Sequence, residues 1–518
     1  MHKLRKGTEI MKLRKILVQI LVLFLLSASY LRAEELSLPP IFSDHMVFQQ
    51  NAPISIYGKA DPGKRISVIF GPSRKTVVAD KSGNWRAILP ARGMLKTGAD
   101  LKVSDGKSTK IFKDILIGEV WICSGQSNMR WMVKQSSEAN EIAGNSSIPQ
   151  IRLIDFTGTL YPDGTVYPAD TIRNLTPGNY FKTEGWQQAS PETAATFSAV
   201  AWIFGRKLYD ELNCPIGLIH NSIGGALTES WISPEALKAE SVLKPLTENW
   251  LESNLMGSWC RGRAELNLRE AIKEKVSPLH HPFEPGFLFE AGIRPLTSYS
   301  IRGAIWYQGE SNCPDSPDGE YTGAHELGIN KLKLVTLIRD WRNQFKNPQL
   351  PFYYVQLPKM NRNWSLYREM QDNLLDEIPG IGMAVTIDTG DPGNVHPKSK
   401  KAVGERLALQ ALSKTYKKNI AADSPRFDRF EKKGNRILLA FKHCEGGLKA
   451  DGEVKGFEIA GKDGNFVRAE AKITGKETVE VFAESIGSPE FVRYCWSNVP
   501  DGNVTNGAGL PMTPFRTD

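Results

Sequence analysis

Hydrophobic and polar positions change their spacing twice along the 518-residue chain. Between about Glu35 and Phe112 they alternate in short segments that end at turns rich in Gly, Pro, Asn and Asp. Short alternating segments of this kind are typical of half-buried strands and favour a small β-sandwich. The predicted strands are Ile54–Gly58, Arg65–Phe70, Lys75–Ala79, Asn84–Leu89 and Asp100–Ser104.

From about Ile115, apolar runs of strand length alternate with longer segments of helical periodicity. The strands are predicted at Val120–Cys123, Ile151–Ile154, Ile216–His220, Gly303–Tyr307, Phe352–Gln356 and Gly382–Ile387. The helices are predicted at Ser198–Leu212, Ile329–Phe345, Leu366–Asp376 and Lys398–Tyr416. Strands that alternate with helices favour a parallel sheet covered on both faces, so residues 114–418 are predicted to be an α/β domain.

After residue 418 short alternating segments return, and they predict a second β domain. Its strands are predicted at Arg436–Phe441, Gly456–Ala460, Val467–Ile473, Thr478–Phe482 and Phe491–Trp496. The predicted organisation is therefore a β domain at 34–113, an α/β domain at 114–418 and a β domain at 419–518. Residues 235–285 are charged and weakly patterned, and we interpret them as a helical lid or insertion.

The first 33 residues have the pattern of a secretory signal peptide. Basic residues precede the apolar core Ile16–Ala28, which is too short for a comfortable membrane span, and Leu31-Arg32-Ala33 offers a cleavage site. An uncleaved anchor is the alternative interpretation. Cleavage predicts a secreted or periplasmic protein without a stable membrane span.

Removal of this segment changes the charge of the chain. Its seven Lys and Arg and one Glu contribute +6 to the formal net charge of +8, which leaves +2. A nearly neutral chain without blocks of Lys or Arg gives no indication of a nucleic-acid partner. The six cysteines have no metal-site spacing, so no metal or other cofactor is predicted, and Cys123 is interpreted as a small core residue.

The candidate nucleophile lies in the stretch Ile117–Trp131. This stretch begins as an apolar strand and ends in Ser-Gly-Gln-Ser-Asn at 124–128, where Gly125 permits a tight turn. A serine that follows a strand directly projects its hydroxyl at the carboxyl edge of the sheet, where open α/β sheets bind ligands. Ser127 is therefore a candidate nucleophile, and a surface Ser-Gly turn is the alternative.

A serine nucleophile requires a base that accepts its proton, and the chain has eight histidines. His396 stands in Asp388-Thr-Gly-Asp-Pro-Gly-Asn-Val-His-Pro, a loop between the last predicted strand and the final helix. This loop lies at the same sheet edge as Ser127, and such loops often carry catalytic groups. His396 is the predicted base, whereas His220 ends an apolar strand and is expected in the core or at its edge.

Two further glycine-containing polar loops follow strands at this edge. Asn221-Ser-Ile-Gly-Gly-Ala contains Gly224 and Gly225, where the backbone could approach a ligand and donate N–H groups to an oxyanion. Trp306-Tyr-Gln-Gly-Glu-Ser-Asn contains Gln308, a candidate amide donor, and Glu310, a residue that would brace the site. A single glycine-containing loop is more often a simple turn than part of an active site. Several such loops at the same sheet edge, together with the His396 loop, are not readily explained as simple turns.

Four motifs combine at this predicted sheet edge: Gly-Gln-Ser-Asn-Met at 125–129, Gly-Gly-x-x-x-Glu-Ser-Trp at 224–231, Trp-Tyr-Gln-Gly-Glu-Ser-Asn at 306–312 and Val-His-Pro at 395–397. Together they resemble the sialate O-acetylesterase family of the SGNH hydrolases. The segments 41–49 and 493–518 also look like the family, so the resemblance covers nearly the whole chain after the leader. It implies a flavodoxin-like three-layer α/β/α catalytic domain and an esterase that removes acetyl groups from carbohydrates.

By this resemblance Ser127 matches the nucleophile and one oxyanion N–H, and His396 matches the base. Gly225, or Gly224, matches the glycine donor of the oxyanion hole, and Gln308 stands where SGNH members have asparagine. The neighbours Gln126, Asn128 and Glu310 would support the site.

The group that orients the histidine departs from the family pattern. SGNH enzymes usually place an aspartate three residues before the histidine, and that position here is Gly393. Asp391 is the predicted substitute and Asp388 the alternative. A Ser-His dyad oriented by a backbone carbonyl is a third arrangement.

The resemblance implies a serine mechanism with an acetyl-enzyme and without a cofactor. The favoured substrates are 9-O-acetyl sialic acids, and acetylated plant polysaccharides such as xylan or xyloglucan are the alternative. A catalytically inactive carbohydrate-binding protein is the alternative from another class. A sialic-acid pocket requires a cation for the substrate carboxylate, and Arg130, Arg294 and Arg368 are the candidates.

Overall fold

The computed structural model describes residues 35–316, 318–321 and 326–518. The predicted signal peptide at 1–33 lies outside the described residues. The chain forms two compact units: residues 35–39, Ser55–Leu89 and Leu101–Ile111 belong to unit 1, and Pro40–Ile54, Pro90–Asp100 and Phe112–Asp518 belong to unit 2. Unit 2 thus includes three segments of the predicted N-terminal domain, the last of them only residues 112–113, and all of the predicted C-terminal domain. The three-domain division stays a prediction.

Unit 1 consists of short paired strands, as the alternating pattern predicts. Its strands are β2 (Ile54–Lys59), β3 (Arg65–Phe70), β4 (Ser73–Val78), β5 (Asn84–Leu89) and the second half of β6 (Leu95–Ser104). Strand β2 pairs with β5, and β3 pairs with β4 and β6. Alternate residues of β5 are buried, including Trp85, Ala87 and Leu89, which confirms the two-residue period.

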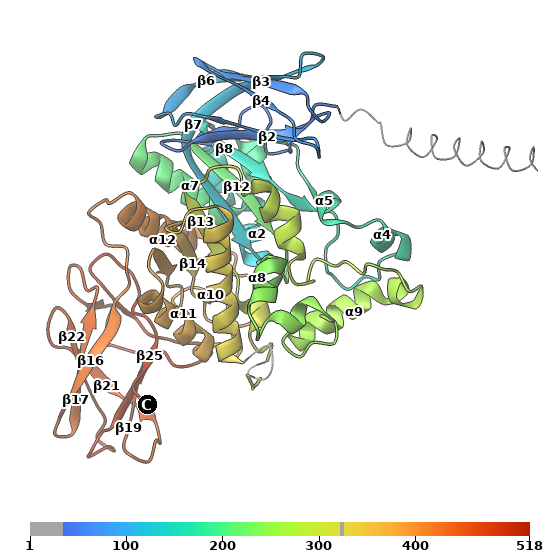
Figure 1. Cartoon of the computed structure of the whole chain (residues 1–518). Helices are drawn as coiled ribbons and strands as arrows, with labels where there is room; N and C mark the ends of the chain where they lie inside the picture. The colour runs from blue at the N-terminus through green and yellow to red at the C-terminus, as the bar shows by residue number, and fades with distance from the viewer. Residues whose placement is uncertain (1–34, 317, 322–325) are drawn as a thin grey trace, which may run out of the picture. The chain divides into compact units, whose positions relative to one another are not determined.

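A large mixed sheet forms the centre of unit 2 (Figure 1). All six predicted strands are present as β7 (Thr109–Gly125), β8 (Ile148–Asp155), β12 (Ile216–Ser222), β13 (Gly303–Tyr307), β14 (Phe352–Val355) and β15 (Ile381–Ala384). They run in the order β8-β12-β7-β13-β14-β15 with parallel pairing throughout. Strand β11 (Gln187–Ala189) joins β8 antiparallel, and β1 (Val47–Gln49) pairs parallel with β7.

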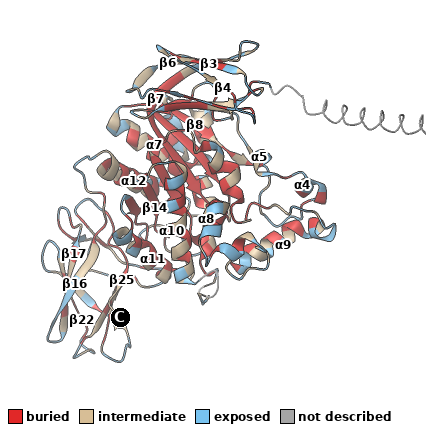
Figure 2. Ribbon diagram, in the orientation of Figure 1, coloured by how far each residue is buried: buried red, intermediate tan, exposed pale blue. Residues whose placement is uncertain are grey.

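Helices cover both faces of this sheet because neighbouring residues of each strand point to opposite sides. Ile305 and Tyr307 of β13 share a core with apolar residues of α7 (Ala199–Leu212) and α12 (Lys401–Gln410). Trp306, which lies between them, contacts Trp341 of α10 (Leu327–Gln344) with ring centroids 5.9 Å apart. Helix α11 (Ser365–Glu377) accepts a 2.5 Å hydrogen bond from the Tyr354 hydroxyl of β14. Buried residues therefore concentrate in these strands and the helices beside them (Figure 2).

The segment 235–285 is helical, as predicted. It contains most of α8 (Pro234–Ala239), the 3₁₀ turn Lys244–Thr247 and α9 (Ser258–Lys273). The shorter helices are α2 (Ser127–Arg130), α3 (Ala139–Gly144), α4 (Ala169–Arg173), α5 (Pro177–Tyr180) and α6 (Pro191–Thr196). Among the described residues, no helix combines the length and apolarity that a membrane crossing requires.

The C-terminal part forms two four-stranded antiparallel sheets. One has the order β16 (Arg426–Lys433), β17 (Arg436–Lys442), β22 (Thr478–Phe482), β21 (Glu470–Ile473); the other has β20 (Val467–Arg468), β19 (Phe457–Ala460), β23 (Phe491–Tyr494), β25 (Phe515–Arg516). Phe515 of the second sheet stacks on Phe427 of the first at 4.7 Å. The single strand predicted over Val467–Ile473 is wrong, because the chain changes sheet at Ala469.

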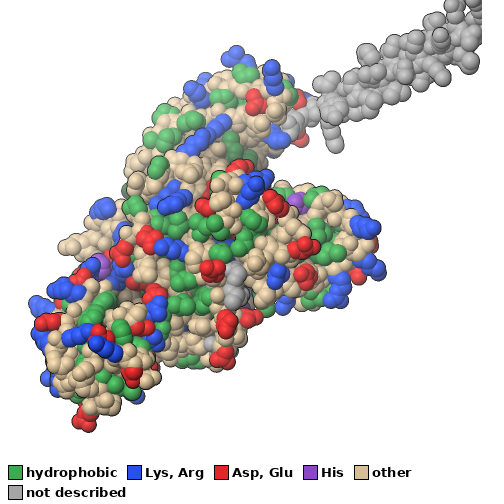
Figure 3. All heavy atoms as spheres, turned by 60° about the horizontal axis from the view of Figure 1, so that its bottom comes forward, with side chains coloured by type: hydrophobic (Ala, Val, Ile, Leu, Met, Phe, Trp, Pro, Cys, Tyr) green, Lys and Arg blue, Asp and Glu red, His purple; other side chains and the backbone are tan. Residues whose placement is uncertain are grey.

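All six cysteines are buried free thiols, and Cys123 lies in the core between α7 and the sheet, as predicted. Basic and acidic side chains are interspersed on the face drawn in Figure 3, as expected for a chain with little net charge outside residues 1–33.

Candidate active site

Ser127 is placed by the turn at the end of β7. Gly125 has φ +141°, and a Cβ atom there would lie 2.1 Å from the carbonyl oxygen of Tyr307, so only glycine fits. The next N–H, that of Gln126, donates to the same carbonyl at 3.0 Å. Ser127 then begins α2. Strand β7 lies between β12 and β13, where the order of the sheet reverses, and ligands of open α/β sheets bind at such a point.

The structure brings Ser127 and His396 together. The Nε2 atom of His396 lies 2.8 Å from the Oγ atom of Ser127, although 269 residues separate them in the chain. Both side chains are half-buried and line a cavity of about 390 Å³. Trp259 of α9 and Tyr161 also line this cavity, so the segment 235–285 contributes to its wall.

A second serine–histidine pair lies in the core, at the end of β12. His220 Nε2 is 2.6 Å from Ser222 Oγ, and His220 Nδ1 is 2.6 Å from Asp155 Oδ1. Ser222 is 0% and His220 1% exposed, and neither lines the cavity. A buried hydroxyl cannot meet a substrate, so this group is part of the core, as the sequence predicts for His220.

Three backbone N–H groups near Ser127 are available for an oxyanion. Ser127 is the first residue of α2, so its N–H has no partner within the helix. The N–H groups of Gly224 and Gly225 donate to no protein atom in the described part of the chain. A Cβ atom on Gly224 would lie 3.7 Å from Cβ of Ser127, whereas one on Gly225, at φ +74°, would lie 2.8 Å from Phe283.

The position of Gln308 does not fit the expected role as an oxyanion donor. Its Nε2 atom donates to the Ala226 carbonyl at 3.2 Å and to Asn312 Oδ1 at 2.6 Å, so both amide hydrogens have partners. The side chain is 1% exposed and does not line the cavity. Thr228 donates to its Oε1 atom at 2.6 Å, and Gln308 thus braces the loop that contains the two glycines.

Neither predicted aspartate contacts His396. Asp391 is exposed and accepts the N–H of Gly393 at 2.9 Å, which folds its carboxylate back onto its own loop. Asp388 forms an ion pair with Arg406, with 2.6 Å between Oδ2 and Nη2. Within the described residues no carboxylate is hydrogen-bonded to the His396 ring, so both expectations are corrected.

Trp131, Arg362 and Lys400 surround His396, and the sequence did not reveal their role. The Trp131 ring stacks on the imidazole with centroids 5.4 Å apart and planes 19° apart. Burial lowers the pKa of His396, and the positive charges of Lys400 and Arg362 lower it further. Arg362 stands alone in a loop without a motif, so no sequence signal could have identified it.

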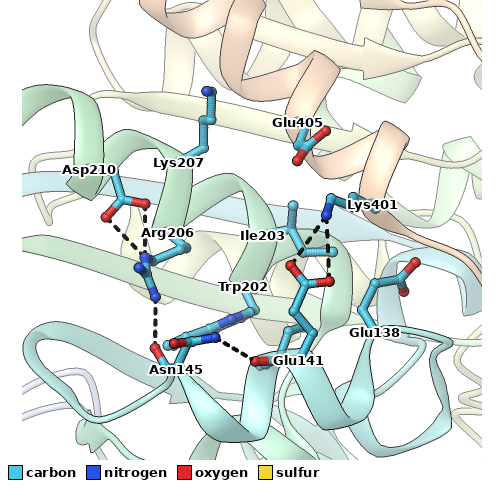
Figure 4. A pocket seen from close by; sticks show the side chains of 11 residues that line it. Glu138, Glu141, Asn145, Trp202, Ile203, Arg206, Lys207, Asp210, Lys401 and Glu405 are labelled. Atoms are coloured by element: carbon cyan, nitrogen blue, oxygen red, sulfur yellow. Dashed lines mark hydrogen bonds and ion pairs between the residues drawn. The ribbon is translucent and has the colours of Figure 1, made fainter.

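A second hollow, of about 300 Å³, lies between α3, α7 and α12 (Figure 4). It holds two ion pairs: Arg206 contacts Asp210 at 2.9 Å, and Lys401 contacts Glu141 at 3.2 Å. It contains no serine or histidine. The cavity over Ser127 is therefore the better candidate for an active site.

Comparisons with known proteins identify the family of the chain. Residues 288–413 match the family model described as carbohydrate esterase, sialic acid-specific acetylesterase. The sialate O-acetylesterase of Mus musculus is 27% identical over 88% of this chain and 88% of its own length, and that of Homo sapiens is 26% identical over 89% and 87%. A carbohydrate acetylesterase from Xanthomonas citri is 30% identical, has a TM-score of 0.76, and is matched over 93% of this chain and 100% of its own.

The chain belongs to the sialic acid-specific acetylesterase family of carbohydrate esterases. The family predicted from the four motifs is thereby confirmed. The predicted reaction class is confirmed with it: this esterase is a carbohydrate O-acetylesterase, a carboxylic ester hydrolase.

Proposed function

We propose that Ser127 and His396 hydrolyse an acetyl ester in two steps. His396 Nε2 takes the Ser127 proton while Oγ bonds to the acetyl carbon, and the tetrahedral oxyanion then collapses. The bond to the sugar oxygen breaks, and the imidazolium returns its proton to that oxygen. Water, deprotonated by His396, attacks the acetyl-serine, acetate leaves and Ser127 regains its proton. The 2.8 Å contact at the cavity wall is the observation that carries this proposal.

The oxyanion hole in this proposal consists of backbone groups. The N–H of Ser127 and that of Gly224 or Gly225 have no other partner among the described residues and lie beside the nucleophile. Such preorganised donors stabilise the charge that develops in the transition state. Acetylation of Ser127 after a rapid acid quench, detected by the mass of its peptide, tests the mechanism.

The fold supports a flavodoxin-like SGNH catalytic domain. The five strands β12-β7-β13-β14-β15 run in the relative order 2-1-3-4-5, and β8 and β11 extend one edge. The aromatic core between the two C-terminal sheets supports a β-sandwich-like domain there. Secretion or periplasmic export rests on the pattern of residues 1–33.

The substrate class that we propose is O-acetylated sialic acid. Two of the predicted arginines have protein partners: Arg294 pairs with Glu290 and Glu235, and Arg368 is buried and donates to backbone carbonyls. Arg130 donates to the Tyr161 hydroxyl at 2.6 Å. Arg362 instead lines the cavity, and its guanidinium forms no ion pair within the described residues. Because a guanidinium binds a carboxylate through a fork of donors, Arg362 is the residue that would hold the acid group of the sugar.

Replacement of Arg362 should separate acidic from neutral substrates. Arg362→Gln is expected to raise the KM for O-acetylated sialic acid about tenfold to a hundredfold, the value of one or two charge-assisted hydrogen bonds. The KM for 4-nitrophenyl acetate and for acetylated xylan should change less than about twofold, because these esters lack a carboxylate. Equal losses on all three substrates would contradict this role, and Arg362→Lys is the charge-conserving control.

The environment of His396 predicts activity at mildly acidic pH. A general base must be unprotonated, so kcat/KM falls as pH decreases through its pKa. Because burial and two nearby cations lower that pKa below the ordinary value of 6.5, the acid limb for 4-nitrophenyl acetate should have its midpoint below pH 6.5. A midpoint at or above 6.5 would contradict the assignment of His396 as the base.

A further inference from the structure

His396 occupies its position without a carboxylate on its ring among the described residues. In triad enzymes a carboxylate holds the imidazole in the correct orientation. The structure must therefore fix this histidine by other contacts, and two sets of them converge on it.

The first set starts at Asn128, the residue after the nucleophile. Its Nδ2 atom donates to the backbone carbonyl of Val395 at 2.9 Å and to Glu310 Oε1 at 2.6 Å. Its Oδ1 atom accepts a 2.6 Å hydrogen bond from Nζ of Lys400. The side-chain amide of Asn128 is fully buried. It therefore connects the backbone of Val395, the residue before His396, to the side chains of Glu310 and Lys400 through hydrogen bonds.

The second set is aromatic. The Trp131 ring stacks on the His396 imidazole, and the Lys400 ammonium lies 5.6 Å from the centre of that Trp131 ring. It also lies 5.8 Å from the ring of Tyr307. An ammonium over an aromatic face is attracted by the ring quadrupole. Lys400 therefore stabilises the position of the Trp131 ring, which in turn stacks on His396.

Lys400 and Glu310 are costly to bury, which argues for a role beyond filling space. They are 1% and 3% exposed, and burial raises the pKa of Glu310 and lowers the pKa of Lys400 to about 7. Glu310 Oε2 has no hydrogen-bond partner among the described residues. Hydrophobic residues of similar size would avoid this desolvation.

We propose that a buried Lys400–Asn128–Glu310 unit, together with Trp131, positions His396 in place of the aspartate that is absent from position 393. These are positioning residues, since none of the contacts described reaches the reacting atoms. The inference rests on the proposed mechanism, and the appearance of acetyl-Ser127 in the wild-type chain tests that mechanism separately.

The test compares Lys400→Met with Lys401→Met in the full chain. Lys400→Met should lower kcat for 4-nitrophenyl acetate about tenfold to a hundredfold with KM changed less than about twofold, because a misplaced base slows chemistry and not binding. Lys401 is the next residue along, half-exposed, and its ammonium pairs with Glu141 at the hollow drawn in Figure 4. Lys401→Met should retain the wild-type kcat.

The pH profile separates a positioning role from a general loss of structure. The charged groups nearest to His396 are Lys400 from the start of α12 and Arg362 from the loop before α11, and Ser127 of α2 contacts its ring. The other titratable groups that line the same cavity are Tyr161, Asp163, Glu310, Cys313 and Asp315. Removal of the Lys400 cation should shift the acid limb to higher pH, toward the ordinary histidine value. An unshifted limb with an unchanged kcat would overturn the proposal.

Three further variants test the proposal if Lys400→Met folds poorly. Trp131→Leu should lower kcat as Lys400→Met does, and Trp131→Phe, which retains a ring, should recover most of it. Asp391→Asn should cost less than about tenfold, since its carboxylate is turned to Gly393. A loss of roughly 10⁴-fold in Asp391→Asn, the effect of disabling a triad aspartate, would overturn the proposal.

Discussion

Ser127→Ala is expected to lower kcat for 4-nitrophenyl acetate by at least about 10⁴-fold and to abolish the acetyl-enzyme burst. The nucleophilic oxygen is the atom that bonds to the acetyl carbon, and serine enzymes without it keep only the residual catalysis of the oxyanion hole and substrate binding. Stopped-flow release of 4-nitrophenol measures both the burst and the steady state.

Ser222→Ala is the matched control because Ser222 forms the other serine–histidine contact, also with a short distance of 2.6 Å. Its hydroxyl is completely buried, so the variant should keep the burst and a kcat within about tenfold of the wild type. If Ser222→Ala loses the burst and Ser127→Ala retains it, the assignment of the nucleophile is wrong.

Lys333→Met is expected to destabilise unit 2 by about 3–5 kcal/mol, the typical loss when one partner of a buried ion pair is removed. Lys333 Nζ lies 2.7 Å from Glu229 Oε1, and both side chains are 0% exposed. Without the lysine, the Glu229 carboxylate would remain in the core with a 3.1 Å hydrogen bond from Asn312. The urea midpoint of tryptophan fluorescence measures the loss, since Trp231 and Trp341 lie nearby in the core.

Lys331→Met on the same helix is the control for this prediction. Lys331 pairs with Glu377 at 2.6 Å, but both side chains are about 40% exposed, and such pairs contribute at most about 1 kcal/mol. The double variant Lys333→Met/Glu229→Gln removes both charges and should recover part of the stability. Similar urea midpoints for Lys333→Met and Lys331→Met would contradict the role of the buried pair.

The parallel strands could be predicted from the sequence because each is a short apolar run that ends in a polar loop. The proximity of Ser127 and His396 could be predicted for the same reason: they follow β7 and β15, whose carboxyl ends lie at the same edge of the sheet. The two units could not be predicted, since they depend on contacts between segments far apart in the chain.

The surroundings of Ser127 and His396 were harder to predict from the sequence than the proximity of these two residues. Gln308 occurs in a strong motif, yet its amide faces Ala226 and Asn312, and sequence does not show the direction of a side chain. Asp391 stands five residues before His396, but the turn at Gly393 directs its carboxylate away. Lys400 and Arg362 reach the site from a helix terminus and a distant loop, where only the folded chain reveals their proximity.

The buried free thiols have a practical consequence. Because all six cysteines are unpaired, folding requires no oxidising compartment, and the chain without residues 1–33 should be obtainable from a reducing bacterial cytoplasm. Burial raises the pKa of the Cys123 and Cys313 thiols, so alkylating reagents should react slowly with them in the native protein. A cysteine introduced at the exposed Asp163 on the cavity rim would then be the fastest-reacting thiol, and a fluorophore attached there would report the arrival of a glycan.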